Sequence, residues 1–265
     1  MKTFKKILIW IVGLLILYIG VCIIIFFLQE KISFISKRLT SDHQLQFDNK
    51  FEELMIPAND GIKLNGALFK ADTSNGLIFF LHGSGGNIER YRKSVPKYLS
   101  LNYDVFLLDY RGYGKSEGKI KNEKQFFEDV RTAYSFMKTK YKEDNIVIIG
   151  FSLGTTLSSM LASENKPRLL VLEGPGYSLI ERSKSKLPYL PVSLISKYKF
   201  ENYMYLKNVK VPVIIYFGSN DDLSGDVRLK QCLKVGDKFI MLEGEGHNDF
   251  ALNNQYINEL SELLK

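Results

Sequence analysis

Short apolar runs alternate with longer, partly polar segments over most of the chain. The runs carry almost no polar residue, which is typical of strands buried on both faces; they cover residues 77–81, 105–108, 146–149, 169–172, 213–217 and 239–242. Most of the intervening segments are long enough for a helix, and residues 124–140 carry an apolar stripe at helical spacing. Helices between buried strands predict a mainly parallel central sheet flanked by helices, which is the α/β class of fold.

Two further segments carry a local signal. Residues 54–57 and 62–69 predict a hairpin around Asn59-Asp60-Gly61, a sequence suited to a turn with positive φ. Residues 90–99 have helical character, although Pro96 lies inside them.

The longest apolar run, Ile7 to Leu28, lies near the N-terminus and contains no charged residue. At about 1.5 Å per residue it would reach about 33 Å, enough to cross a hydrocarbon core of about 30 Å. A cleaved signal peptide would have a shorter apolar region and a small-residue cleavage site, but this run ends in Phe26-Phe27-Leu28. We therefore expect one N-terminal transmembrane helix that anchors the protein in a membrane bilayer.

The expected organisation is an anchor at residues 1–30, a connector at residues 31–50 and one folded domain at residues 51–265. Basic residues flank the apolar run on both sides in nearly equal number. The positive-inside rule then favours only slightly a cytoplasmic N-terminus, with the folded domain on the non-cytoplasmic side.

Composition narrows the possible partners. The net charge is +7, but the lysines are scattered rather than striped, so we expect no nucleic-acid partner and some attraction to anionic lipid. The two cysteines, Cys22 and Cys232, form neither a disulfide framework nor a zinc-binding spacing. We expect no metal and no cofactor, and the sequence leaves the oligomeric state open.

The most specific motif is Gly150-Phe151-Ser152-Leu153-Gly154, which directly follows the apolar run 146–149 and precedes a helix-forming stretch at 155–162. A serine at the apex of a strand–turn–helix unit needs a strained backbone and small neighbours, which glycine supplies. Its hydroxyl would lie above the carboxyl edge of the sheet, beside the positive end of a helix. Ser152 is therefore the candidate nucleophile.

Loops that follow other strands supply further candidates, because chemistry in parallel α/β sheets gathers at the carboxyl ends of the strands. His82-Gly83-Ser84-Gly85-Gly86-Asn87 lacks the ending of a P-loop, which weakens a phosphate-binding interpretation. As an oxyanion loop, it would offer the backbone N–H of Ser84 together with that of Leu153. We interpret His82 as structural, and Asp109 and Arg111 as residues that brace a glycine-rich loop.

An acid and a histidine follow the last two strands. Asp221 comes after the run 213–217, and His247 comes after the run 239–242. A solvated loop histidine is the plain alternative for His247. The order Ser152, Asp221, His247 instead matches one known order of a serine–acid–histidine triad and differs from the two common protease orders.

With these motifs the chain resembles the α/β-hydrolase superfamily, and more narrowly the single-span α/β-hydrolase-domain proteins that include lysophospholipid and monoacylglycerol lipases and protein depalmitoylases. The resemblance runs from Phe51 to the C-terminus and rests on residues 81–87, 109–114 and 150–154, Gly218 with Asp221, and Gly246 with His247. It selects Asp221 over Asp222, because the acid of the superfamily falls three residues after the glycine. Leu223-Ser224-Gly225 departs from the Val-Pro pair that relatives often carry.

The resemblance also implies a short lid at about residues 176–207, where Pro188 and Pro191 break any long helix. Its apolar residues either line an acyl groove or pack on the core; they are Leu187, Tyr189, Leu190, Leu194 and Ile195.

The expected protein is a membrane-anchored serine hydrolase that cleaves acyl esters or thioesters, on lipid-borne or acylated substrates. The alternatives are a general small-ester carboxylesterase and a catalytically idle membrane scaffold. Dehalogenase chemistry would need a carboxylate in place of Ser152. The acyl chain, the leaving group and the physiological substrate stay open.

Overall fold

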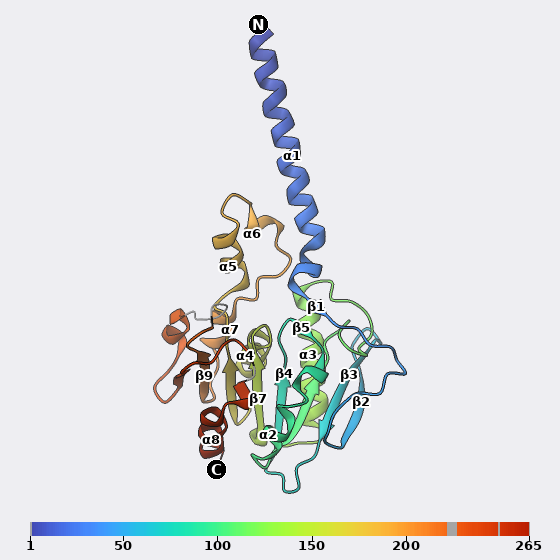
Figure 1. Ribbon diagram of the computed structural model, residues 1–265, viewed down its shortest axis with the longest axis vertical. Coiled ribbons are helices and arrows are strands. Elements are labelled where there is room, and N and C mark those ends of the chain that lie inside the picture. The colour runs from blue at the N-terminus through green and yellow to red at the C-terminus, as the bar shows by residue number, and fades with distance from the viewer. Residues whose placement is uncertain (1, 222–226, 249, 265) are drawn as a thin grey trace.

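The buried strands assemble into one eight-stranded sheet in the order β10-β9-β8-β7-β4-β6-β3-β2 (Figure 1). The computed structural model describes residues 2–221, 227–248 and 250–264. Neighbouring strands are parallel except at the β2–β3 and β3–β6 pairs. Helices cover both faces of the sheet, so the predicted α/β class of fold is confirmed (Figure 1).

The six buried strands lie where the apolar runs predict them, within one or two residues, and β2 begins three residues before its predicted start. Their bounds are β2 Phe51–Pro57, β3 Lys63–Phe69, β4 Leu77–Leu81, β6 Asp104–Leu108, β7 Ile146–Phe151, β8 Leu169–Glu173, β9 Val213–Gly218 and β10 Lys238–Leu242. A separate parallel pair joins β1, Ile35–Ser36, to β5, Gly85–Gly86. The predicted hairpin is the antiparallel β2–β3 pair.

The helices are α1 Lys2–Ser33, α2 Val95–Leu99, α3 Glu123–Lys138, α4 Gly154–Glu164, α5 Leu179–Lys186, α6 Val192–Ile195, α7 Asn202–Leu206 and α8 Asn254–Leu263. Short 3₁₀ turns cover η1 Ile88–Tyr91, η2 Glu143–Asn145, η3 Val227–Cys232 and η4 Phe250–Leu252. The helix predicted over residues 90–99 is divided into η1 and α2. Pro96 lies in the first turn of α2, where its missing N–H costs nothing. A single helix over residues 90–99 would place Pro96 in its interior and lose a hydrogen bond there.

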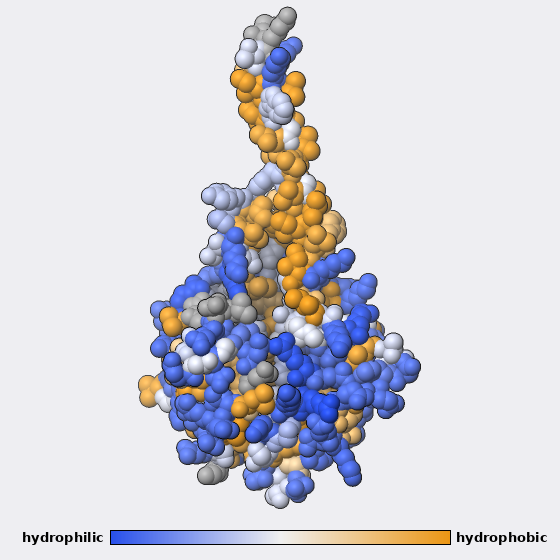
Figure 2. All heavy atoms as spheres, viewed as in Figure 1, coloured by the Kyte–Doolittle hydropathy of each residue, from blue (hydrophilic) through white to orange (hydrophobic). Residues whose placement is uncertain are grey.

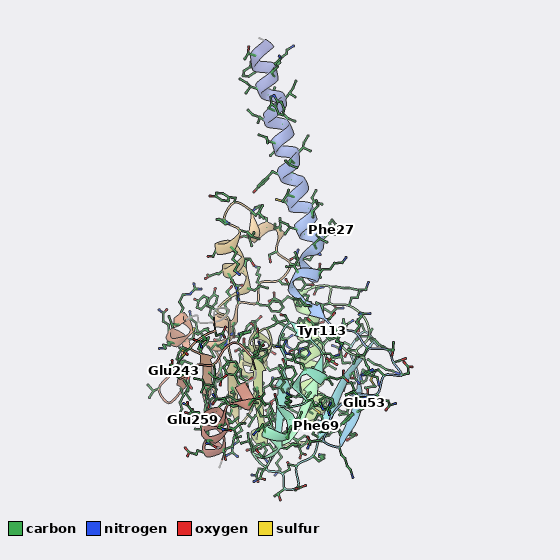
Figure 3. All side chains as sticks on the ribbon, viewed as in Figure 1. Phe27, Glu53, Phe69, Tyr113, Glu243 and Glu259 are labelled. Atoms are coloured by element: carbon green, nitrogen blue, oxygen red, sulfur yellow. The ribbon has the colours of Figure 1, made fainter. Side chains whose placement is uncertain are left out.

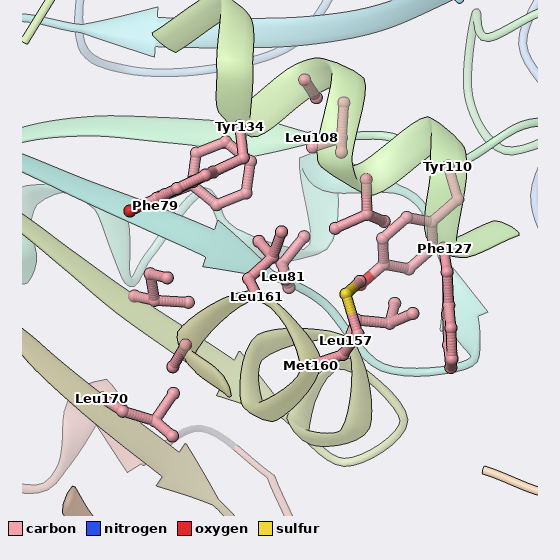
Figure 4. Packing of buried hydrophobic residues seen from close by; sticks show 14 of the residues in the cluster. Phe79, Leu81, Leu108, Tyr110, Phe127, Tyr134, Leu157, Met160, Leu161 and Leu170 are labelled. Carbon is pink, nitrogen blue, oxygen red and sulfur yellow. The ribbon is translucent and has the colours of Figure 1, made fainter. Parts of the chain in front are cut away.

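The core has two layers, one on each face of the sheet. Successive side chains of β4 show this division, since Phe79 packs with α3 and α4 while Phe80 packs with α2 on the opposite face. On the face that Phe79 occupies, Tyr134 of α3 and Leu157 of α4 pack against the strands, as Figure 4 shows. The absence of polar residues from these runs follows from this burial on both sides.

Helix α1 projects away from the sheet, and most of its apolar side chains contact no other part of the protein (Figures 1 and 2). Trp10 is 74% exposed and Ile16 is 65% exposed. Leaving so much apolar surface in water is unfavourable, so such a helix is consistent with a membrane anchor.

The chain that follows α1 is built into the domain. Phe34 is buried among Phe126, Tyr198 and Phe200, with ring centroids 4.9–6.3 Å from its own. The edge-to-face geometry of these pairs is the favourable one for aromatic rings. Phe34 of the predicted connector is therefore packed into the domain.

We predict that Phe34→Ala lowers the free energy of unfolding by about 3–5 kcal/mol, because a buried aromatic side chain is lost and a cavity is left. Ile35→Ala is the matched control, since Ile35 is 67% exposed and should change stability little. Chemical denaturation of the full chain in detergent, followed by circular dichroism, measures both. Equal losses in the two variants would show that Phe34 does not join α1 to the core.

Candidate active site

Ser152 lies at the tip of the turn between β7 and α4, with a φ of 50°. This left-handed conformation is strained for a serine. The turn is tight: a Cβ on Gly150 would lie 2.1 Å from Ser158 Oγ, and one on Gly154 would lie 2.0 Å from the Leu81 carbonyl oxygen. The two glycines of the motif are thus required by close packing, as the sequence predicts.

His247 and Asp221 meet Ser152 in one chain of hydrogen bonds. His247 Nε2 is 2.9 Å from Ser152 Oγ, and His247 Nδ1 is 2.7 Å from Asp221 Oδ2. The Asp221 carboxylate is buried, whereas the His247 side chain keeps 15% exposure. A carboxylate on Nδ1 fixes the tautomer in which Nε2 accepts a proton, so this chain is able to deprotonate the serine hydroxyl.

The loops that carry the acid and the histidine are fastened to each other. The Ser219 N–H donates to the Leu242 carbonyl oxygen at 3.0 Å, and the Asn220 N–H donates to the Glu245 carbonyl oxygen at 2.9 Å. These bonds continue the pairing of β9 with β10 past the strand ends. Asp222 and the Leu223-Ser224-Gly225 segment lie outside the described residues.

The glycine-rich loop after β4 passes directly beside the serine. A Cβ on Gly83 would lie 3.3 Å from the Ser152 Cβ. Ser84 and Leu153 line the same cavity as Ser152, and among the described residues their backbone N–H groups donate to no other protein group. Two unpaired N–H groups at a serine are the donors that an oxyanion needs.

The carbonyl side of this loop is firmly held. The Ser84 carbonyl oxygen accepts hydrogen bonds from the Ile35 N–H at 2.9 Å and from the Tyr113 hydroxyl at 2.8 Å. Tyr113 lies just below the end of α1 in Figure 3. The β1 strand, which the sequence did not predict, therefore braces the loop that carries Ser84.

The other candidates have structural positions. His82 is fully buried, with Nδ1 2.7 Å from the Gly83 carbonyl oxygen and Nε2 3.5 Å from Asp109 Oδ1. Burial raises the pKa of Asp109, although the hydrogen bond from His82 opposes this shift. The Asp109 carboxylate also accepts a hydrogen bond from the Ile88 N–H. Arg111 bonds the carboxylates of Asp60 and Asp129. These contacts brace the loop, as the structural interpretation predicts.

A cavity of about 1010 Å³ opens above Ser152 and His247. Its apolar wall includes Leu179, Phe200 and Val227, and its upper part reaches Ser33 at the end of α1. The lid residues proposed from the sequence lie elsewhere. Leu187, Tyr189, Leu190, Leu194 and Ile195 do not line this cavity, because the tip of the α5–α6 segment turns toward α1.

Sequence reasoning missed a buried carboxyl next to the site. The Glu173 carbonyl oxygen accepts the Ser152 N–H at 2.9 Å, and its side chain accepts the hydroxyls of Tyr98 and Tyr256. Burial raises the pKa of Glu173 to about 7, and the two tyrosine hydrogen bonds offset part of the rise. The available signal was an acid at the end of the apolar run 169–172, at the edge where the other candidates lie.

We predict that Glu173 makes stability fall with rising pH. Its pKa is higher in the folded protein than the ordinary value of 4.5, so its ionisation disfavours folding as the pH rises from about 4.5 to about 7. In Glu173→Gln this part of the decline, up to about 3 kcal/mol, should be absent. Denaturation curves across this pH range measure it, with the exposed Glu262→Gln as the control. A wild-type profile in Glu173→Gln would exclude the effect.

Fold and site together define the class: the protein is an α/β hydrolase. A family model described as "Serine aminopeptidase, S33" matches residues 72–204, half of the 265 residues, and the chain belongs to this family within the α/β-hydrolase superfamily. The matched region contains Ser152 and Ser84 but ends before Asp221 and His247.

Individual relatives are distant. Uncharacterized protein R595 of Acanthamoeba polyphaga mimivirus is 28% identical over 269 residues, which cover 87% of this chain and 91% of that protein. Human alpha/beta hydrolase domain-containing protein 17B is 28% identical over 170 residues, which cover 62% of this chain and 57% of that protein. Among solved structures, the Pyrococcus furiosus esterase Pf2001 has a TM-score of 0.67 at 20% identity and covers 87% of this chain and 96% of its own.

Proposed function

We propose that the protein is a membrane-anchored serine hydrolase that cleaves acyl ester or thioester bonds. The observation that carries the proposal is the hydrogen-bonded chain from Ser152 Oγ through His247 to the buried Asp221, at the floor of a cavity. No metal or cofactor takes part in the proposed reaction.

In the proposed mechanism His247 Nε2 takes the Ser152 hydroxyl proton while the oxygen attacks the acyl carbonyl carbon. The carbonyl electron pair moves onto oxygen, where the Ser84 and Leu153 N–H groups stabilise it. Collapse of this intermediate breaks the bond to the leaving group, which takes the proton from His247, and leaves an acyl-serine. Water then attacks the acyl-serine in the same manner, and Asp221 stabilises the imidazolium each time.

The proposed substrate carries an apolar acyl chain and is met at a membrane surface. The cavity offers Leu153, Leu179, Phe200 and Val227 to such a chain. The proposed anchor, residues 1–30, would hold the cavity close to a bilayer and so raise the effective concentration of lipid-borne substrates. Residues 176–207 would form the short lid, since Leu179 and Phe200 come from it.

We predict that Ser152→Ala and His247→Ala each reduce hydrolysis by roughly 10⁴–10⁶-fold, because members of such a unit act only together. Ser163→Ala and His43→Ala are matched controls that change the same residue types outside the cavity. Ester hydrolysis and labelling by a fluorophosphonate provide the two readouts. A folded Ser152→Ala protein with activity within about tenfold of wild type would exclude the mechanism.

We predict that Asp221→Asn lowers kcat by roughly 10⁴-fold, because an amide at this place favours the wrong imidazole tautomer. The neighbouring Asp222→Asn, which makes the same chemical change, should have a far smaller effect. Steady-state kinetics on one ester compares the two. Equal or reversed losses would mean that the acid is misassigned.

We predict that kcat/KM rises with acyl length from two to about eight carbons, by up to about fourfold per CH₂, since each buried CH₂ contributes about 0.8 kcal/mol. A series of esters of one alcohol, used below micelle-forming concentrations, measures the trend. A flat or falling profile would reject the apolar acyl chain and favour the small-ester carboxylesterase. A matched thioester series would show which leaving group is preferred.

A further inference from the structure

The tip of the α5–α6 segment, residues 187–195, exposes large apolar side chains. Tyr189 is 89% exposed, Leu194 is 84% exposed and Leu187 is 42% exposed. Figure 2 shows an orange, hydrophobic surface that continues from α1 onto this side of the protein, above a mostly hydrophilic domain. Such a continuous apolar surface marks an interaction site.

Contacts with α1 fix the height of this tip. The Tyr18 hydroxyl donates to the Tyr189 carbonyl oxygen at 3.0 Å, and the Gln29 amide donates to the Ile195 carbonyl oxygen at 3.1 Å. Between these two bonds, an apolar groove joins α1 to α6; it is lined by Tyr18, Ile19, Cys22, Ile23, Phe26, Phe27, Pro191, Leu194 and Ile195. The tip therefore runs beside the apolar run Ile7 to Leu28 rather than below it.

The position of the tip along α1 determines whether it lies in water or in the bilayer. Tyr18 lies ten residues before Leu28, which is about 15 Å along a helix. If Ile7 to Leu28 crosses a hydrocarbon core of about 30 Å, the chain around Tyr189 must lie in the same hydrocarbon.

Most backbone donors of the tip are absent or paired, which lowers the cost of an apolar medium, where an unpaired N–H is unfavourable. Pro188 and Pro191 have no N–H. Among the described residues, five N–H groups of the tip donate to protein carbonyl oxygens; they belong to Leu187, Leu190, Val192, Leu194 and Ile195, whereas those of Tyr189 and Ser193 have no protein acceptor. The two prolines thus reduce the number of donors as well as ending the helices.

Basic residues occupy the ends of the two helices that lead to the tip. Lys184 and Lys186 lie in the last turn of α5, and Lys31 lies in the last turn of α1. Lys197 bonds Glu30 at 2.8 Å, just beyond the end of the apolar run. An apolar tip next to helix ends that carry lysines matches acyl chains next to anionic phosphates.

We propose that residues 187–195 insert into the bilayer beside α1, as a second membrane contact whose partner is the acyl chains of phospholipid. This inference rests on the proposed anchoring of α1. The cavity above Ser152 then opens beneath the membrane between the end of α1 and α5, whose Ser33 and Lys186 line it. A lipid-borne substrate therefore meets the mouth of this cavity at the membrane surface.

Tryptophan fluorescence of the full chain in phosphatidylcholine vesicles tests the insertion. Trp10 is the only tryptophan, so Trp10→Phe provides a silent background. In this background Leu194→Trp places a probe on the tip. Val235→Trp is the matched control, because Val235 is fully exposed. It lies just before β10, at the amino end of that strand, whereas the catalytic cavity lies at the carboxyl ends. Circular dichroism checks that both variants fold.

With lipid brominated along its acyl chains, Leu194→Trp should lose about half of its emission or more and shift to shorter wavelength. Val235→Trp should keep its intensity and respond to aqueous iodide instead. Tyr189→Trp repeats the test if Leu194→Trp misfolds. Iodide quenching of the tip probes without bromolipid quenching would overturn the proposal. Trp10 in the unmodified protein tests the anchor separately, and no readout depends on hydrolysis.

Discussion

Ser152 directly follows β7, which lies between β4 and β8 in the sheet. Residues of both neighbouring strands contact the turn that carries Ser152. On the β4 side, Gly154 packs against the Leu81 carbonyl with no room for a side chain. On the β8 side, the Ser152 N–H donates to the Glu173 carbonyl oxygen. A positive φ at a serine persists only where surrounding structure enforces it. Here the enforcement comes from the strand order, so the position of the hydroxyl is a consequence of the sheet.

The same edge of the sheet receives the end of α1. Ser33 lines the cavity, Phe34 enters the core, and the Ile35 N–H holds the carbonyl of Ser84. The end of α1 is thus joined through three consecutive residues to the loop that lies beside Ser152, and β1 provides the direct contact between them.

The sequence predicts what depends on neighbouring residues or on strand order. The buried strands were found within one or two residues, and Ser152 and His247 were selected because each follows such a strand. Asp221 also follows one, and the resemblance to the superfamily selected it over Asp222. Pairing between distant short segments was not predictable: β1 and β5 have two residues each and no periodicity. The direction of the α5–α6 tip was also missed, since an apolar residue such as Leu194 has the same pattern whether it faces the core, a cavity or the flank of α1.

Glu173 shows how a polar group is tolerated behind the site. Only its backbone is needed by Ser152, and an apolar side chain would avoid the unfavourable burial of a carboxyl. The hydroxyls of Tyr98 from α2 and Tyr256 from α8, however, are buried with it and find their acceptor there. Removing that acceptor would leave two buried donors unpaired, which is costly in its own right. The carboxyl thus joins two helices on the face of the sheet behind Phe151, whose ring packs against the imidazole of His247.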